Sequence, residues 1–321
     1  YGYNGMTPQG GLCLGSDGNF YGTTQLGGNF NGGTIFKMTP AGTLTTLVHL
    51  GSASPNTGTQ PKAALVQAAD GSFYGSTTAA GTSGVGTLFK VTPAGVLTVL
   101  VNLTGTTGAA PGSNVQAAMI QGLDSNLYGV TGSGGSASGL GCVFKCTTAG
   151  AYTVLAAFGG ATGNLGSTPL GALVQAADGT LYGTTSTSGA SSNGTIFKCT
   201  TAGVLTTLQS FTGSTGAVIG STCSAPMIFG GDGSLYGTTA GSGTTFYGTL
   251  FKITTAGVFT NIRSLLSSDG ASTPIGGLVL AGDTNMYGTL TGNLVSVGAN
   301  RGGFFKLAPG TSTFTFITGY P

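Results

Sequence analysis

The chain is built from one unit that recurs six times along its length. A Tyr-Gly pair marks each copy, and successive pairs lie 51 to 54 residues apart. Each copy also has an Asp four residues before the tyrosine and a Phe-Lys pair 15 to 18 residues after it. A repeat of this length folds as one supersecondary unit that completes its core by packing on its neighbours. The marker tyrosines are Tyr21, Tyr74, Tyr128, Tyr182, Tyr236 and Tyr287.

Each copy contains four segments with the residue content of β-strands. In the second copy they are residues 64–67, 73–77, 87–92 and 96–103, which are rich in β-branched and aromatic side chains. Asp-Gly and Ala-Gly pairs between them favour tight turns, because glycine adopts positive φ without strain. Four-stranded units repeated four to eight times are typical of β-propellers. We therefore predict an all-β, six-bladed β-propeller with four antiparallel strands per blade.

The copies predict a single propeller domain over residues 1–321. Blades pack face to face, so both faces of the middle strands should be apolar, as in the segment Ile35, Phe36 and Met38. Residues 316–321 followed by 1–8 resemble one more of the connectors that join successive blades. The blades are expected at approximately residues 10–50, 63–103, 116–158, 171–211, 225–265 and 276–319.

Charged residues are rare, and most of them belong to the repeat. They make up 5% of the chain, and one Asp and one Lys recur in each copy. An Asp at a hairpin turn caps nearby backbone amides, and a Lys among apolar neighbours offers its ammonium to a carboxylate or to carbonyls. We interpret both sets as structural; the alternative is a ring of lysines that binds an anion. The residues are Asp17, Asp70, Asp124, Asp178, Asp232, Asp283, Lys37, Lys90, Lys145, Lys198, Lys252 and Lys306.

Several classes of function fit this composition poorly. A net charge of +2 without a basic cluster argues against nucleic acid as a partner, and no apolar run reaches the roughly 20 residues of a membrane span. One Asp per turn supplies too few oxygens for calcium, and zinc-ligand spacing is absent, so we expect no metal and no cofactor. The only histidine, His49, has no titratable neighbour in sequence. We predict that the chain is not an enzyme and has no catalytic residues.

The five cysteines do not predict a disulfide framework. Cys13, Cys146 and Cys199 occupy apolar positions of the repeat and are expected to be small buried hydrophobes. Cys142 and Cys146 lie four residues apart on one strand, too far for a disulfide. The pair Cys142 and Cys223 remains open.

These residues resemble a known family. The segments GSDGNFYGTT (residues 15–24), GTIFK (33–37) and AGTL (41–44) are similar to the GloVer tandem repeat of bacterial exported proteins. The similarity extends over nearly the whole chain in six copies. It implies a secreted or surface-attached protein and no enzymatic activity of the repeat itself.

One face of the predicted propeller collects the variable segments. It holds the loops between second and third strands together with the long connectors, and binding residues commonly lie on loops of a rigid scaffold. A lectin-like site for glycans is the alternative function, although ordinary loop variation explains the same differences. The candidate residues are Phe30, Asn56, Phe246, Tyr247, Asn300 and Arg301.

The outermost strands indicate a second kind of surface. They should be exposed edges, and Arg263 and His49 are the only basic side chains along them. Such edges favour side-by-side association unless bulges, connectors or glycans cover them. Aromatic residues at the chain ends would suit a subunit junction. The candidate assembly residues are Tyr1, Tyr3, Tyr320 and Pro321.

Taken with the resemblance, these features predict a non-enzymatic, secreted structural or adhesive protein. We expect it outside the cell or on the bacterial cell surface. Its expected partners are other copies of itself, in a filament or layer, and surface glycans.

Overall fold

The computed structural model describes residues 5–52, 56–159, 165–243, 247–266, 273–291, 302–308 and 313–319. Every regular element in these residues is a β-strand. Among them, no helix has the length and apolar character needed to cross a membrane. The chain divides into two compact units, one formed by residues 1–159 and 201–203 and the other by residues 160–200 and 204–321.

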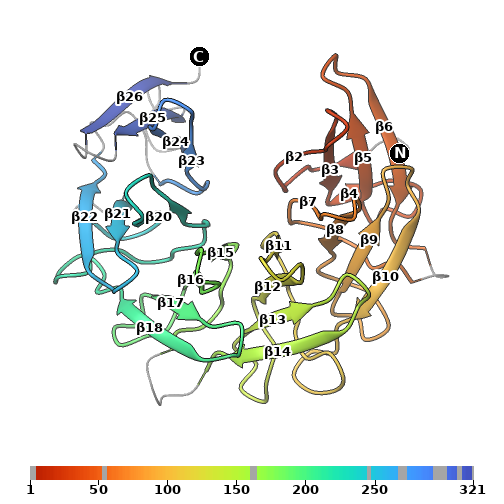
Figure 1. Ribbon diagram of the computed structural model, residues 1–321, viewed down its shortest axis with the longest axis horizontal. Coiled ribbons are helices and arrows are strands. Elements are labelled where there is room, and N and C mark those ends of the chain that lie inside the picture. The colour runs from red at the N-terminus through yellow and green to blue at the C-terminus, as the bar shows by residue number, and fades with distance from the viewer. Residues whose placement is uncertain are drawn as a thin grey trace. The chain divides into compact units, whose positions relative to one another are not determined.

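The first unit contains three antiparallel sheets of four strands each. Its fourth strands lie along one side of the unit and its first strands along the other (Figure 1). Sheet 1 is formed by β2 (Cys13–Leu14), β3 (Phe20–Thr24), β5 (Thr34–Met38) and β6 (Leu44–His49). Sheet 2 is formed by β7 (Val66–Gln67), β8 (Phe73–Ser76), β9 (Thr87–Val91) and β10 (Leu97–Asn102). Sheet 3 is formed by β11 (Ile120–Gln121), β12 (Leu127–Thr131), β13 (Cys142–Cys146) and β14 (Tyr152–Ala157).

The second unit repeats the same topology three times. Sheet 4 is formed by β15 (Val174–Gln175), β16 (Leu181–Thr185), β17 (Thr195–Cys199) and β18 (Leu205–Ser210). Sheet 5 is formed by β19 (Ile228–Phe229), β20 (Leu235–Thr239), β21 (Thr249–Ile253) and β22 (Phe259–Ser264). Sheet 6 is formed by β23 (Val279–Leu280), β24 (Met286–Thr291), β25 (Gly302–Ala308) and β26 (Thr313–Gly319).

The described residues form seven sheets, whereas six were predicted. Six of them are the predicted four-stranded antiparallel sheets, and the seventh pairs β1 (Gly5–Met6) with β4 (Leu26–Gly27). The additional sheet has a local cause. In the second copy, the connector forms a single bridge, Thr59 with Ala79, to the loop between the second and third strands. In the corresponding place before sheet 1, β1 forms two adjacent residue pairs with β4, and the two strands therefore make a short sheet of their own.

The turns between strands contain glycines with positive φ, as predicted. Gly18 and Gly42 have φ of 78° and 87°, and the Gly18 amide donates to the Gly15 carbonyl at 2.9 Å to close the first turn. In sheet 3 the corresponding position is Ser125, with φ of 63°. The strands of the second copy lie where they were predicted but are up to two residues shorter at their ends.

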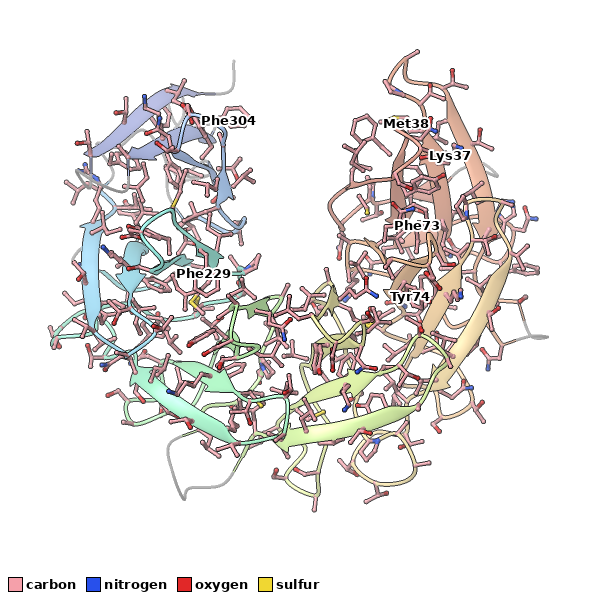
Figure 2. All side chains as sticks on the ribbon, viewed as in Figure 1. Lys37, Met38, Phe73, Tyr74, Phe229 and Phe304 are labelled. Atoms are coloured by element: carbon pink, nitrogen blue, oxygen red, sulfur yellow. The ribbon has the colours of Figure 1, made fainter. Side chains whose placement is uncertain are left out.

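Within each unit, successive sheets pack face to face and share a core. We call the side of a sheet that carries the marker tyrosine its leading face, and the opposite side its trailing face. Tyr21 and Ile35 on the leading face of sheet 1 join one buried cluster with Phe73 and Phe89 on the trailing face of sheet 2. Phe73 and Tyr74 are neighbours in β8 and lie on opposite faces (Figure 2). The same arrangement joins sheets 2 and 3, 4 and 5, and 5 and 6.

The fourth strand ends every four-stranded sheet, as predicted for an exposed edge. Each fourth strand also has a register shift against the third strand, for example between Val99 and Val101 in β10. Such bulges bend and twist an edge and make it a poorer template for another strand. The shift recurs in all six described pairs of third and fourth strands. Of the alternatives considered for the edges, the structure therefore supports protection by bulges.

Candidate functional sites

A polar cluster lies at the first turn of sheet 1. The Asp17 carboxylate accepts hydrogen bonds from the Asn19 amide at 3.1 Å, from the Tyr21 hydroxyl at 2.9 Å and from the Lys37 ammonium at 3.0 Å. Tyr21 and Lys37 are paired across β3 and β5, which places the ammonium 5.7 Å from the centre of the tyrosine ring. The cluster therefore ties the turn to the two middle strands.

The same ion pair occurs in sheets 2 and 5. Lys90 lies 2.8 Å from Asp70, and Lys252 lies 2.7 Å from Asp232. In the other three sheets the Asp still accepts a hydrogen bond from the amide two residues later, but their lysines form no ion pair within the described residues. The unpaired lysines are Lys145, Lys198 and Lys306.

The electrostatics of the cluster keep its acid ionised and its phenol neutral. The Lys37 hydrogen bond lowers the pKa of Asp17 well below its usual range. At Asp232, partial burial raises the pKa, but hydrogen bonds from Lys252, the Ser234 amide and Tyr236 outweigh it and bring the value to about 2. Burial and the Asp70 carboxylate raise the pKa of Tyr74. None of these shifts moves a group towards neutral pH, where a general acid or base works best.

A second repeated feature, which the sequence analysis missed, is a pair of buried threonine hydroxyls. The Thr77 and Thr87 hydroxyls lie 2.9 Å apart, and the Thr77 oxygen also accepts a hydrogen bond from the Thr87 amide. A glycine of the incoming connector packs against each pair; a Cβ at Gly58 would overlap the Thr77 hydroxyl. The signal in the sequence was a Thr that recurs three residues after the marker tyrosine. Equivalent pairs are Thr24 with Thr34, Thr185 with Thr195, and Thr239 with Thr249.

The five cysteines are all free thiols. The two that were left open as a pair, Cys142 and Cys223, are therefore not bonded to each other. Cys142 replaces one threonine of the hydroxyl pair in sheet 3, with its sulfur 3.3 Å from the Thr131 oxygen. Cys146 and Cys199 are fully buried as predicted, and burial raises the pKa of each to about 11.

Cys13 differs from that prediction, because it is only half-buried. It packs at the margin of the cluster between sheets 1 and 2. Burial nevertheless raises its pKa, so the thiolate that reacts is scarce at neutral pH.

His49 has a structural contact at the end of β6. Its Nδ1 accepts a hydrogen bond from the Asn29 amide at 3.4 Å. At the end of β10, Asn102 Oδ1 accepts in the same way from the Thr82 amide at 2.9 Å. Both side chains thus hold the loop between the second and third strands. No group of three or more metal-ligating side chains is present in the part of the chain that the structure describes.

The candidate loop residues have different environments. The connectors, which were predicted to share a face with the loops between second and third strands, pair with these loops at single bridges and in the short sheet of β1 and β4. Phe30 is 54% exposed, whereas Asn56 accepts a hydrogen bond from the Gly81 amide and Tyr247 is half-buried against the core between sheets 5 and 6. Only Phe30 among these three therefore offers an aromatic surface to solvent. Phe246, Asn300, Arg301, Tyr1, Tyr3, Tyr320 and Pro321 lie outside the described residues.

Antiparallel four-stranded sheets that pack face to face, each built from one sequence repeat, define a β-propeller-like repeat protein. The chain belongs to the Gloeobacter/Verrucomicrobia repeat family, whose model matches residues 7–225 and 117–320. This confirms the resemblance noted in the sequence. No curated protein sequence matches the chain.

Solved structures with a similar fold have low sequence identity to this chain. Virginiamycin B lyase from Staphylococcus aureus is 13% identical with a TM-score of 0.60, covering 97% of this chain and 84% of the lyase. A putative 6-phosphogluconolactonase from Bacteroides fragilis is 14% identical with a TM-score of 0.57, covering 97% and 83%. A GH74 enzyme from Niastella koreensis is 22% identical with a TM-score of 0.61, covering 98% of this chain and 46% of the enzyme. At these identities the similarity concerns the fold alone.

Proposed function

We propose that this protein is a non-enzymatic structural or adhesive protein, secreted to the bacterial surface or the extracellular space, whose copies associate with one another. The proposal is supported mainly by one observation, which is that the repeated ionisable residues form hydrogen bonds and ion pairs with one another. Asp17, Tyr21 and Lys37 bind one another at a turn, and the same contacts recur in other sheets. Groups used in this way stabilise the repeat, and their pKa shifts do not suit proton transfer near neutral pH.

We also propose that the six four-stranded sheets are the six blades of one β-propeller. The face-to-face packing within each unit supports this, because it is the packing that propeller blades use. The similar solved structures support it as well.

Glycan binding is the second candidate. Phe30 favours it, because an exposed aromatic ring on a loop can stack on a sugar ring. Under this alternative the protein adheres to surface glycans through its loops.

Light scattering and negative-stain microscopy of the purified chain test the main proposal. We expect the particle mass to rise with protein concentration and ordered assemblies to form. A particle that stays monomeric at high concentration would contradict self-association.

A glycan array with the native chain and a Phe30→Ala variant tests the second candidate, for which sugar binding must be lost in the variant. Assays for polysaccharide hydrolysis and for lyase and lactonase turnover address the activities named for the similar structures. Turnover by the purified chain would refute the non-enzymatic role.

A further inference from the structure

The loops between the second and third strands of sheets 1 and 2 have the same backbone hydrogen bonds at their tips. In sheet 1 the Asn31 amide donates to the Gly28 carbonyl at 3.3 Å, and in sheet 2 the Gly84 amide donates to the Gly81 carbonyl at 3.2 Å. In both sheets the last side chain of the fourth strand also accepts a hydrogen bond from a loop amide. Residues 29–31 of the first loop therefore correspond to residues 82–84 of the second.

Sheet 1 presents an aromatic ring at this tip, where sheet 2 presents a small side chain. Asn29, Phe30 and Asn31 are all exposed, and sheet 2 has Ser83 in the place of Phe30. Ser83 is exposed as well, although sheet 2 packs against a sheet on either side within its unit. The exposure of the tip is therefore a property of the loop itself and does not depend on the place of sheet 1 in its unit.

The tip of sheet 1 is held by two hydrogen bonds. His49 Nδ1 accepts from the Asn29 amide at 3.4 Å, and Asn31 Oδ1 accepts from the Gly27 amide at 3.1 Å. Binding to a loop that is already held in one conformation costs less conformational entropy than binding to one that must first be ordered. The three tip side chains therefore form a prepared surface.

This surface has hydrogen-bonding groups but no charge. The Asn31 side-chain nitrogen keeps its two N–H donors, and within the described residues the Asn29 side-chain amide has no hydrogen-bond partner. Residues 18–36 and 38–61 contain no Asp, Glu, Lys or Arg, and Lys37 between them is ion-paired at the first turn. A phosphate-rich or acidic ligand would therefore find no positive charge here.

We infer that the tip of this loop binds an uncharged glycan. The Phe30 ring stacks on the apolar C–H face of a sugar, and the Asn29 and Asn31 amides bond to its hydroxyl groups. A sugar fits because it offers both an apolar face and groups that donate and accept hydrogen bonds. His49 is a positioning residue that acts through the Asn29 backbone amide. The inference rests on glycan binding, the second candidate function, and specifies its residues and its class of sugar.

An array of neutral, sulfated and uronic-acid-containing glycans tests the class of ligand, and titration calorimetry with a bound glycan tests the residues. We expect the native chain to bind uncharged glycans. Phe30→Ala should weaken binding at least about tenfold, and Asn29→Ala at least about twofold. Ser83→Ala, at the matching position of sheet 2, is the control and should bind as the native chain does. Binding confined to acidic glycans, or unchanged binding by Phe30→Ala, would overturn the inference.

Two substitutions of His49 test its positioning role. His49→Ala removes the acceptor of the Asn29 amide and should weaken binding. His49→Asn should restore most of the affinity, because Asn102 makes the matching contact in sheet 2. Thermal melts show whether both variants fold. Equal affinities of the two folded variants would overturn this role.

Transfer of the tip to sheet 2 tests whether these residues suffice. The recipient chain carries Phe30→Ala, and the graft adds Thr82→Asn, Ser83→Phe and Gly84→Asn. A Cβ at Gly84 would meet no atom within 4 Å, and its φ of 77° is one that asparagine tolerates. We expect the graft to restore binding of the glycans that the native chain binds. The same graft with Ser83→Ala in place of Ser83→Phe should not restore it. A graft that folds, as shown by its thermal melt, but binds no glycan would overturn the inference.

The two failures can be told apart. If the native chain binds no glycan, the second candidate function and the inference both fail. If Phe30→Ala abolishes binding but the bound glycans are acidic or the folded graft stays inactive, glycan binding stands and only the inference fails.

Discussion

The threonines of the hydroxyl pairs are stable in buried sites because their hydroxyls have hydrogen-bond partners. In the pair formed by Thr77 and Thr87, the Thr77 oxygen contacts both the hydroxyl and the amide of its partner. A buried backbone amide needs a hydrogen-bond partner. Thr77 provides this partner for the Thr87 amide, and the connector glycine Gly58 packs over the pair. The pair therefore fastens a connector to the end of the middle strands.

Replacing Thr77 with valine should destabilise the protein, because valine has the same shape but leaves the Thr87 amide without its acceptor. We expect a loss of about 1 to 3 kcal/mol, seen as a lower midpoint of urea unfolding. Thr77→Ser keeps the hydroxyl and should lose less. If valine and serine at this position gave the same midpoint, the hydroxyl would have no such role.

At the scale of elements, the first turn of each sheet depends on an ionised aspartate. The pKa of the carboxyl group is lowered in all six turns. The folded state therefore binds protons less readily than the unfolded chain at acidic pH. The resulting stabilisation is complete above the ordinary pKa of about 4 and is lost as the pH falls through the lowered values.

Acid should therefore lower the stability of the folded state. Because the pKa of Asp232 lies at about 2, we expect the melting temperature to fall steadily from about pH 4 to about pH 2. Asp232→Asn removes one titrating group, so its melting temperature should be lower than that of the native chain at pH 7 and should change less over this range. Circular dichroism melts measure both. A native melting temperature that is constant from pH 4 to pH 2 would contradict the linkage.

At the scale of the whole molecule, association should be governed by apolar surface. The chain has a net charge of +2, and only 5% of its residues are charged. Raising the salt concentration from about 0.1 M to about 1 M shortens the screening length from about 10 Å to about 3 Å and weakens contacts between charges. We expect the association constant from sedimentation to fall less than about threefold over this range. A fall of a hundredfold would indicate an interface held by ion pairs.

A feature of the fold or of the candidate site could be predicted from the sequence when the residues that form it lie close together within one copy of the repeat. The turns at Gly18 and Gly42 and the strand around Phe36 follow from local propensity and recur at fixed spacing, so the sequence indicates them directly. The hydroxyl pairs join the second and third strands, which are separated in the sequence by loops of variable composition. They were therefore not predicted from the sequence. The exposure of Phe304 was equally hidden, because its neighbours in sequence resemble those of the buried Leu88.

The bulge in every fourth strand limits the geometry of any polymer that this chain forms. With lateral hydrogen bonding disfavoured at those strands, we expect any assembly to form through surfaces other than the sheet edges, without a hydrogen-bonded sheet that continues from one copy to the next.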